Sequence, residues 1–277
     1  MKAVILRGPA GSGKTSLSEY ISANILKSQY RYLLCHEWIT AEEFTYSIHI
    51  PAVALQMAGM PQKNFYQKGI LAQAVEISKE SPITITIDEL DKASTKIDAL
   101  LLDFTQNCRV VNPNGQLEYG NTENIALFIT TNEERDLIDP LQRRCLKVYL
   151  PFLDSAVETD LLAKNGGTYH IDSIRRFVIE YVQYEPKLYV SPKLQRLISK
   201  VATFLRSKGL DISLYEMKKL YLHIPMVAKN VEWAELLIKG WFCRNDDYTE
   251  ALDERFKGLK NLANAILDLY WQEKRSF

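Results

Sequence analysis

Eight residues near the N-terminus constrain the fold of this chain more than any other feature. They follow the apolar run Val4-Ile5-Leu6 and precede a helical pattern, so that a glycine-rich loop connects a strand to a helix. Such glycines let backbone N–H groups turn toward phosphate oxygens, while Lys14 reaches the terminal phosphates and the Thr15 hydroxyl can ligate magnesium. The pattern therefore predicts a nucleotide triphosphate site. Its residues are Gly8, Pro9, Ala10, Gly11, Ser12, Gly13, Lys14 and Thr15, with Ser16 next in the helix.

The composition is that of an ordinary globular protein. The chain has 277 residues, of which 47% are hydrophobic and 25% charged, which is enough for one large domain or two modest ones. Lys plus Arg and Asp plus Glu both total 34. This balance gives no global electrostatic case for binding nucleic acid or an anionic membrane.

Targeting and redox signals are sparse. No apolar stretch has the length of a membrane span, and a strand is expected within two or three residues of Met1, which leaves no room for a signal peptide. We therefore expect a cytoplasmic protein. Its four cysteines have no C-x-x-C spacing, which favours reduced thiols over disulfides or a zinc site.

The first half of the chain alternates short β-rich runs with helical patterns. This alternation predicts an α/β fold in which helices cover both faces of a five-strand parallel sheet. The expected strands are 2–7, 31–37, 83–88, 124–130 and 146–150, and the expected helices are 14–27, 65–79 and 95–107. A turn at Asn112-Pro113-Asn114-Gly115 between β-formers predicts an extra hairpin over 110–119.

Helical periodicity dominates after Pro151, and strand signals nearly vanish. We therefore divide the chain into a nucleotide-binding α/β domain (1–152) and an all-α lid domain with a C-terminal helical extension (153–277). Apolar stripes at helical spacing run over 171–182, 194–205 and 248–270. We expect the last of them to pack against the rest of its own chain, with a seam between subunits as the alternative.

A second motif, which is acidic, indicates which reaction the nucleotide undergoes. The alternating strand pattern of 83–87 ends in Asp88-Glu89. Asp88 can hold the magnesium shell, and Glu89 can orient or deprotonate an attacking water. A small-molecule kinase needs no such glutamate, because its nucleophile is the second substrate. The pair thus favours hydrolysis over phosphate transfer.

Two further motifs follow at the ends of later strands. Asn132 comes after the apolar run 125–129, at the edge of an open α/β sheet where ligands collect, and its amide can position water against the terminal phosphate. Arg143 and Arg144 precede the last strand of the domain. An arginine exposed there can reach the nucleotide of a neighbouring subunit and stabilise transition-state charge.

In this order the motifs resemble the AAA+ ATPase family. They match Walker A (Gly8 to Thr15), Walker B (Asp88 and Glu89), sensor 1 (Asn132) and the arginine finger, for which Arg144 is preferred over Arg143. The resemblance implies ATP and Mg²⁺ as cofactors, with Thr15 and Asp88 at the metal. It also implies a homo-oligomeric ring, usually a hexamer, with active sites between subunits.

Within that family the chain looks most like the MoxR-like and dynein-related branch. The resemblance rests on Gly69-Ile70-Leu71, on the run 88–93, on the hairpin at 110–119 and on a candidate helix-2 insert at 44–64. In that branch these inserts line or overhang a central pore.

Two features depart from the branch. Ser191-Pro192-Lys193 looks like its Ser-Pro-Arg step, with Lys193 in place of the sensor 2 arginine. A lysine cannot bind phosphate bidentately, and Arg196 one turn later is the alternative. In addition, the sheet begins almost at Met1, so the segment that usually helps to hold adenine is absent from the pattern.

The leading hypothesis is an ATPase that remodels or assembles a protein client, in a branch whose members often work with a von Willebrand factor A domain protein. Three alternatives stay open at this stage. Residues 140–145 also resemble the Ser-Arg-Cys motif of clamp loaders, which suggests a replication ATPase acting on DNA. The altered sensor 2 suggests a nucleotide-switched assembly subunit with little turnover, and a small-molecule kinase remains the third.

Overall fold

The computed structural model describes residues 1–58, 65–155, 157, 170–187 and 189–274. Within these ranges no helix is both long and apolar enough to cross a lipid bilayer. Residues 59–64 of the expected insert lie outside the described residues.

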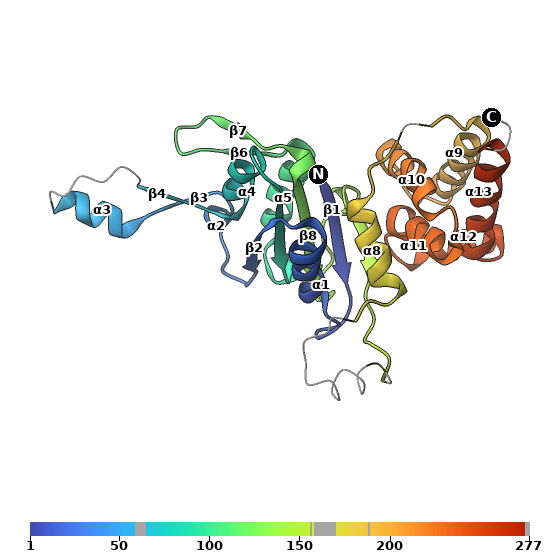
Figure 1. Cartoon of the computed structure of the whole chain (residues 1–277), viewed down its shortest axis with the longest axis horizontal. Coiled ribbons are helices and arrows are strands. Elements are labelled where there is room, and N and C mark those ends of the chain that lie inside the picture. Colours follow the sequence, from blue (N-terminus) through green and yellow to red (C-terminus); the bar gives the residue numbers. More distant parts are fainter. Residues whose placement is uncertain (59–64, 156, 158–169, 188, 275–277) are drawn as a thin grey trace. The chain divides into compact units, whose positions relative to one another are not determined.

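Five strands form one sheet in the order β2-β5-β8-β1-β9 (Figure 1). Each register given for β2 with β5, β5 with β8 and β1 with β9 is parallel, as predicted. Strands β5 and β8 are buried along their whole length, which their continuous runs of apolar and threonine residues allow. The strands are β1 (Lys2–Arg7), β2 (Gln29–Leu34), β5 (Ile83–Asp88), β8 (Ile125–Thr131) and β9 (Leu146–Tyr149).

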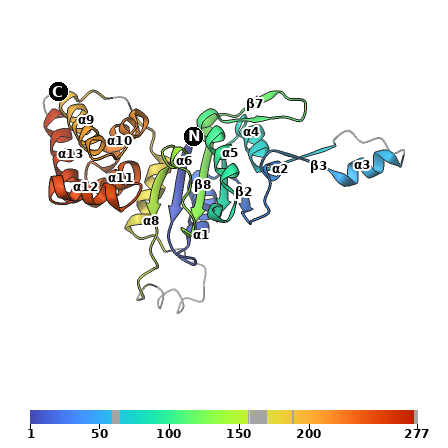
Figure 2. The same ribbon diagram turned by 180° about the vertical axis from the view of Figure 1, so that it is seen from behind.

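Helices cover both faces of the sheet, which confirms the predicted α/β class. Figure 1 shows α1 (Lys14–Tyr20) in front of the strands, and Figure 2, from behind, shows α5 (Thr95–Asn107) in front of them. The expected helix 14–27 changes to π-helical geometry at η1 (Ile21–Leu26) and ends at Lys27, which has a φ of 48°. A helical turn, η2 (Leu90–Lys92), follows β5 directly.

An insert and a hairpin, which are separate in the sequence, extend toward the same side in Figure 1. The insert contains α2 (Ala41–Phe44), β3 (Tyr46–Ile48), α3 (Ile50–Met57) and β4 (Tyr66–Lys68). The hairpin pairs β6 (Arg109–Val111) with β7 (Leu117–Tyr119) in antiparallel register, as predicted, and the turn η3 (Thr122–Asn124) follows it. The Tyr46 hydroxyl donates to the Glu118 carboxylate at 2.8 Å, so a hydrogen bond connects the insert to the hairpin.

The helix expected over 65–79 is shorter than predicted. Residues 66–68 form β4, which pairs antiparallel with β3, and α4 (Ile70–Ser78) begins only after Gly69. A Cβ on Gly69 would lie 2.4 Å from the Glu43 carbonyl oxygen. The close approach of the two backbones therefore requires glycine at the start of α4.

The rest of the described chain is helical outside its loops, as expected after residue 151. The third apolar stripe runs through two helices rather than one, because α12 ends at the left-handed residue Lys257 (φ of 56°) and Gly258 (φ of 116°) follows in the turn. The elements are α6 (Asp139–Gln142), α8 (Ser173–Gln183), α9 (Pro192–Ser207), α10 (Leu214–Val227), α11 (Val231–Phe242), α12 (Asp246–Phe256) and α13 (Leu259–Lys274).

Internal contacts divide the chain into two compact units. One comprises residues 1–3 and 13–141, and the other residues 4–12 and 142–277. The second unit thus contains residues 4–7 of β1, strand β9 and the helices from α8 to α13. A boundary between residues 152 and 153 stays a prediction.

Strand β9 and helix α11 pack very closely within the second unit. A Cβ on Gly240 would lie 2.4 Å from a Leu146 side-chain atom and 2.9 Å from the Lys147 carbonyl oxygen. Only a residue without a side chain fits at this point of the helix, which accounts for a glycine in the middle of α11.

Burial makes Lys147 of β9 a source of instability at neutral pH. Desolvation lowers its pKa from 10.5 to about 8, although the Glu216 carboxylate opposes this, and its ammonium has no hydrogen-bond partner among the described residues. This pKa shift corresponds to on the order of 3 kcal/mol. Because the folded-state pKa is lowered, the cost is full below about pH 8 and disappears as pH rises toward 10.5.

We therefore expect Lys147→Met to raise the free energy of unfolding at pH 7, and the gain to shrink toward pH 10. Urea denaturation of both proteins at the two pH values measures this. A gain that is equal at both pH values, or a loss at pH 7, would contradict the expectation.

Candidate active site

The carboxyl ends of β5 and β8 bring acidic and polar groups together. Asp88, the last residue of β5, accepts hydrogen bonds through Oδ1 from the Thr15 hydroxyl at 2.8 Å and the Thr130 hydroxyl at 2.6 Å. Its Oδ2 accepts from the Tyr32 hydroxyl at 2.9 Å. The predicted metal residues Thr15 and Asp88 are therefore in direct contact.

The P-loop adopts the backbone that its glycines allow. Gly8, Gly11 and Gly13 have φ values of 138°, 82° and 80°, which side chains disfavour. Gly13 also precedes the first residue of α1, so the loop leads into a helix N-terminus, where anions bind favourably. The loop geometry thus matches a phosphate-binding site.

Lys14 lies beside the predicted sensor. Its Nζ donates to Asn132 Oδ1 at 2.8 Å, which joins the P-loop to the end of β8. The residue is only 6% exposed. Burial lowers the pKa of Lys14, while the carboxylates of Asp88 and Asp91 oppose the shift. The neighbouring carboxylates favour the charged form of the ammonium, and this charge is what a phosphate would meet beside the P-loop.

Glu89 is held in an unusual backbone conformation. Its φ of 53° and ψ of 48° are left-handed, and such geometry in a residue with a side chain tends to occur at functional sites. The Glu89 N–H donates to Thr130 Oγ1 at 2.9 Å. The Glu89 carboxylate accepts hydrogen bonds from Asn132 Nδ2 at 3.1 Å and from Lys92 Nζ at 2.6 Å. The bond with Glu89 raises the pKa of Lys92.

The structure adds residues to the site that the sequence analysis did not identify. Tyr32 binds Asp88, and this bond together with burial raises the pKa of the phenol. The Asp91 carboxylate accepts from the Asn132 N–H at 2.9 Å and so fixes the sensor backbone. For Asp91, the sequence offered one signal of a role in the site, its position two residues after Glu89. For Tyr32, the neighbouring sequence offered no such signal.

An ion pair supports the loop after β5. Asp98 of α5 is fully buried and binds both terminal nitrogens of Arg135, at 2.8 Å and 2.7 Å. The same guanidinium donates to the carbonyl oxygens of Leu90 and Ala93. Since a bidentate pair of this kind is geometrically specific, it fixes the backbone next to Glu89.

The donor set fits magnesium and a triphosphate. Mg²⁺ prefers hard oxygen ligands, which Asp88 and Thr15 offer. The Ser12 hydroxyl is buried and has no hydrogen-bond partner among the described residues. Since buried polar groups are normally hydrogen-bonded, this hydroxyl fits a loop that binds a polar ligand such as a phosphate. No group of three or more His, Cys, Asp or Glu side chains that could by itself hold a metal ion occurs in the described ranges.

Residues 3–145 match the family model of the AAA domain in the dynein-related subfamily. The chain belongs to this family. The match covers the whole cluster from Gly8 to Asn132, together with Arg143 and Arg144, and so confirms the resemblance to AAA+ ATPases. The protein is an ATP-hydrolysing P-loop enzyme.

The fold of this AAA protein is also found in a solved structure. A crystal structure of a "putative ATPase" from Cytophaga hutchinsonii superposes with a TM-score of 0.62 at 15% identity, over 96% of this chain and 84% of that one. At this identity the likeness concerns the fold alone. No curated protein matches the chain.

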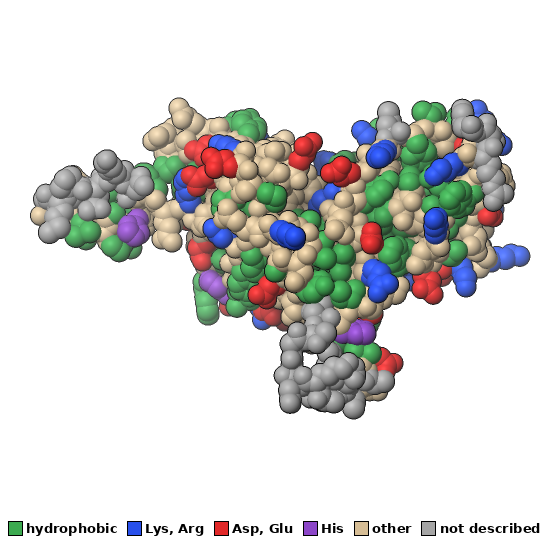
Figure 3. All heavy atoms as spheres, in the orientation of Figure 1, with side chains coloured by type: hydrophobic (Ala, Val, Ile, Leu, Met, Phe, Trp, Pro, Cys, Tyr) green, Lys and Arg blue, Asp and Glu red, His purple; other side chains and the backbone are tan. Residues whose placement is uncertain are grey.

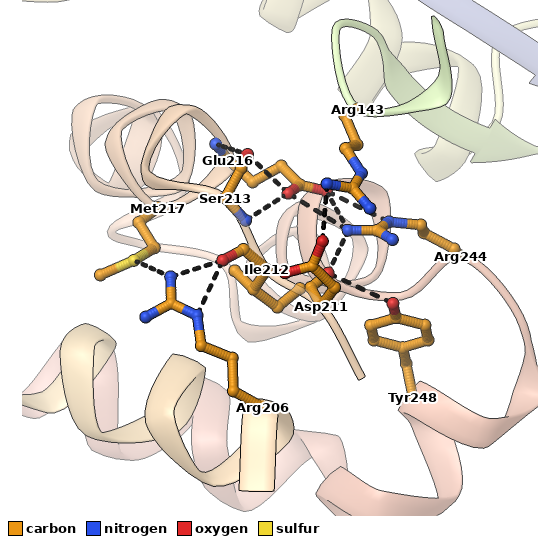
Figure 4. A network of polar contacts seen from close by, with 9 residues as sticks. All are labelled: Arg143, Arg206, Asp211, Ile212, Ser213, Glu216, Met217, Arg244 and Tyr248. Carbon is orange, nitrogen blue, oxygen red and sulfur yellow. Dashed lines mark hydrogen bonds and ion pairs between the residues drawn. The ribbon is translucent and has the colours of Figure 1, made fainter. Parts of the chain in front are cut away.

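Both finger candidates of this AAA protein contact its helical part. Arg143 forms an ion pair with Asp211 at 2.8 Å, in a network that also contains Glu216 and Arg244 (Figure 4). The Arg144 guanidinium lies 4.9 Å from the ring centroid of Tyr215, in a cation–π contact. Arg143 is thus bound by a carboxylate, whereas Arg144 stacks on an aromatic ring.

The sensor 2 candidates of the AAA protein lie at the start of α9. The side chains of Lys193 and Arg196 are exposed. The Lys193 N–H donates to the Glu273 carboxylate at 3.1 Å, and the Ser191 hydroxyl binds the same carboxylate. The N-terminus of this helix is therefore capped by a carboxylate of its own chain, and a role for Lys193 stays a prediction.

Proposed function

We propose that this AAA protein is a MoxR-like ATPase that hydrolyses Mg²⁺-bound ATP at the subunit interfaces of a ring, with a hexamer favoured, to remodel or assemble a protein client. The observation that carries the catalytic part is the cluster in which Lys14, Asn132 and Glu89 are joined by hydrogen bonds of 2.8 and 3.1 Å. The magnesium ion would neutralise charge on the phosphates, held by Thr15 and Asp88.

The geometry supports a role for each of this chain's own groups in the proposed reaction. Lys14 and the P-loop N–H groups bind the phosphates. Glu89 is the general base for water, and Asn132 positions that water because its amide also binds the Glu89 carboxylate. Arg144 is assigned as the finger acting on the neighbouring subunit, since its partner is an aromatic ring rather than a carboxylate.

The client part of the proposal is supported by exposed apolar side chains on the insert and the hairpin. Figure 3 shows hydrophobic side chains on the insert. Among the insert residues, Ile50 is 74% and Met57 85% exposed. On the hairpin, Val111 and Tyr119 are 55% and 54% exposed. Exposed apolar residues of this kind suit contact with another protein. A von Willebrand factor A domain protein is the partner type that the branch suggests.

The ring part is tested by ATP hydrolysis per subunit as a function of protein concentration, with sedimentation velocity on the same samples. We expect the specific activity to rise as oligomers form, because each site needs a residue from a neighbour. Activity that is constant while the protein sediments as a monomer would contradict shared sites. Tight ATP binding with negligible turnover by the assembled ring would instead indicate a nucleotide-switched subunit.

A further inference from the structure

One arginine of the helical part is almost completely buried. Arg175 lies in the first turn of α8 and is 1% exposed, whereas its neighbour Arg176 is exposed. Arg175 lies on the same buried face of α8 as Val178, Ile179 and Val182, at helical spacings of three, four and seven. A buried guanidinium is costly unless its donors are satisfied, so its hydrogen bonds show why it is there.

Those bonds lead to the P-loop. Arg175 Nη2 donates to the backbone carbonyl oxygen of Ser12 at 2.5 Å, and Nη1 pairs with the Asp172 carboxylate. Asp172 also accepts from the Arg175 N–H at 2.8 Å, and thereby caps the helix and orients the guanidinium. Ser12 and Arg175 belong to the same compact unit.

Holding the Ser12 carbonyl also fixes the next N–H group. The carbonyl of Ser12 and the N–H of Gly13 belong to one planar peptide unit and point in opposite directions. Gly13 has a φ of 80°, in the region where glycine is free to change conformation. A guanidinium that binds one end of this peptide therefore sets the direction of the donor at the other end, next to Lys14.

We propose that Arg175 is a positioning residue for nucleotide binding: it holds the Ser12–Gly13 peptide in the orientation in which the Gly13 N–H meets a phosphate oxygen. The helical part is then coupled to the nucleotide through α8, rather than through the exposed Lys193 at the start of α9. The inference rests on the proposed binding of ATP by the P-loop, and it requires neither a ring nor a client.

The test is equilibrium binding of a fluorescent ATP analogue and of ADP, in a Glu89→Gln background in which nucleotide is not consumed. Arg175→Met retains the apolar stem and removes the donors. We expect Arg175→Met to weaken the binding of both nucleotides by about tenfold or more, which corresponds to the loss of one charged hydrogen bond. Arg175→Lys, which keeps a donor, should recover part of the loss, and Arg176→Met serves as the matched control.

Two readouts separate positioning from a general loss of structure. Thermal unfolding without nucleotide should differ little between Arg175→Met and Arg175→Lys. In the enzyme that keeps Glu89, Arg175→Lys should change KM for ATP more than kcat. If Arg175→Met does not fold, the changes in KM and kcat of Arg175→Lys relative to the unsubstituted enzyme still test the inference. Unchanged affinity in a folded Arg175→Met, or the same loss from Arg176→Met, would overturn the inference. Failure of the unsubstituted protein to bind ATP would instead contradict the proposed function.

Discussion

Glu89→Gln is expected to reduce ATP hydrolysis by at least about 100-fold while ATP binding persists, because an amide cannot act as a general base. The substitution keeps the shape of the side chain, and the amide oxygen can still accept from Asn132 Nδ2, as the carboxylate does at 3.1 Å. Steady-state phosphate release measures the loss, and calorimetric titration with ATP measures the retained binding.

The control applies the same chemical change away from the cluster. Glu80 is exposed and follows α4, so Glu80→Gln should hydrolyse ATP at the unsubstituted rate. If Glu89→Gln keeps more than about a tenth of that rate, Glu89 is not the base, because general-base catalysis contributes more than this.

Arg144→Ala is expected to reduce turnover by about 10³-fold, the scale of an arginine that stabilises phosphoryl-transfer charge. If the arginine acts on the next subunit, mixing two inactive proteins restores activity. A subunit with Arg144→Ala keeps Glu89, and a subunit with Glu89→Gln keeps Arg144. Random mixing in equal amounts makes about a quarter of the head-to-tail interfaces complete.

The matched control for this mixture is the double variant that carries both substitutions. Mixed with either single variant, it completes no interface, so its mixtures should stay inactive. Full activity of Arg144→Ala alone would reassign the finger to Arg143, whose ion pair with Asp211 would then have to open. Absence of rescue by assembled mixed oligomers would contradict action between subunits.

Much of the sheet and the site could be predicted because the signals are local. The apolar run before Gly8 and the alternation of 83–87 each mark a strand within a few residues. Parallel strands end at one edge of a sheet, which is why Asp88 and Asn132 were expected near the P-loop. The family match to residues 3–145 confirms the predicted AAA+ type of this domain, whereas the roles of Asp88 and Asn132 stay predictions.

The rest depends on contacts between residues that are distant in the sequence. Residues 66–68 form a strand only because they pair with 46–48, and helical periodicity cannot reveal that. Tyr32 reaches Asp88 across 56 positions, and Arg175 reaches Ser12 across 163. No pattern in the chain marks such pairs, whose partners become known only with the fold.

The glycine in the middle of α11 gives the helical region a mechanical connection to the nucleotide loop. Since only hydrogen fits between Gly240 and strand β9, the helix and the strand must move together. Strand β9 pairs with β1 from Val4 to Arg7, and the Leu150 carbonyl oxygen would lie 2.2 Å from a Cβ on Gly8. A continuous path of close backbone contacts thus runs from α11 through two neighbouring strands to Gly8, the first residue of the P-loop.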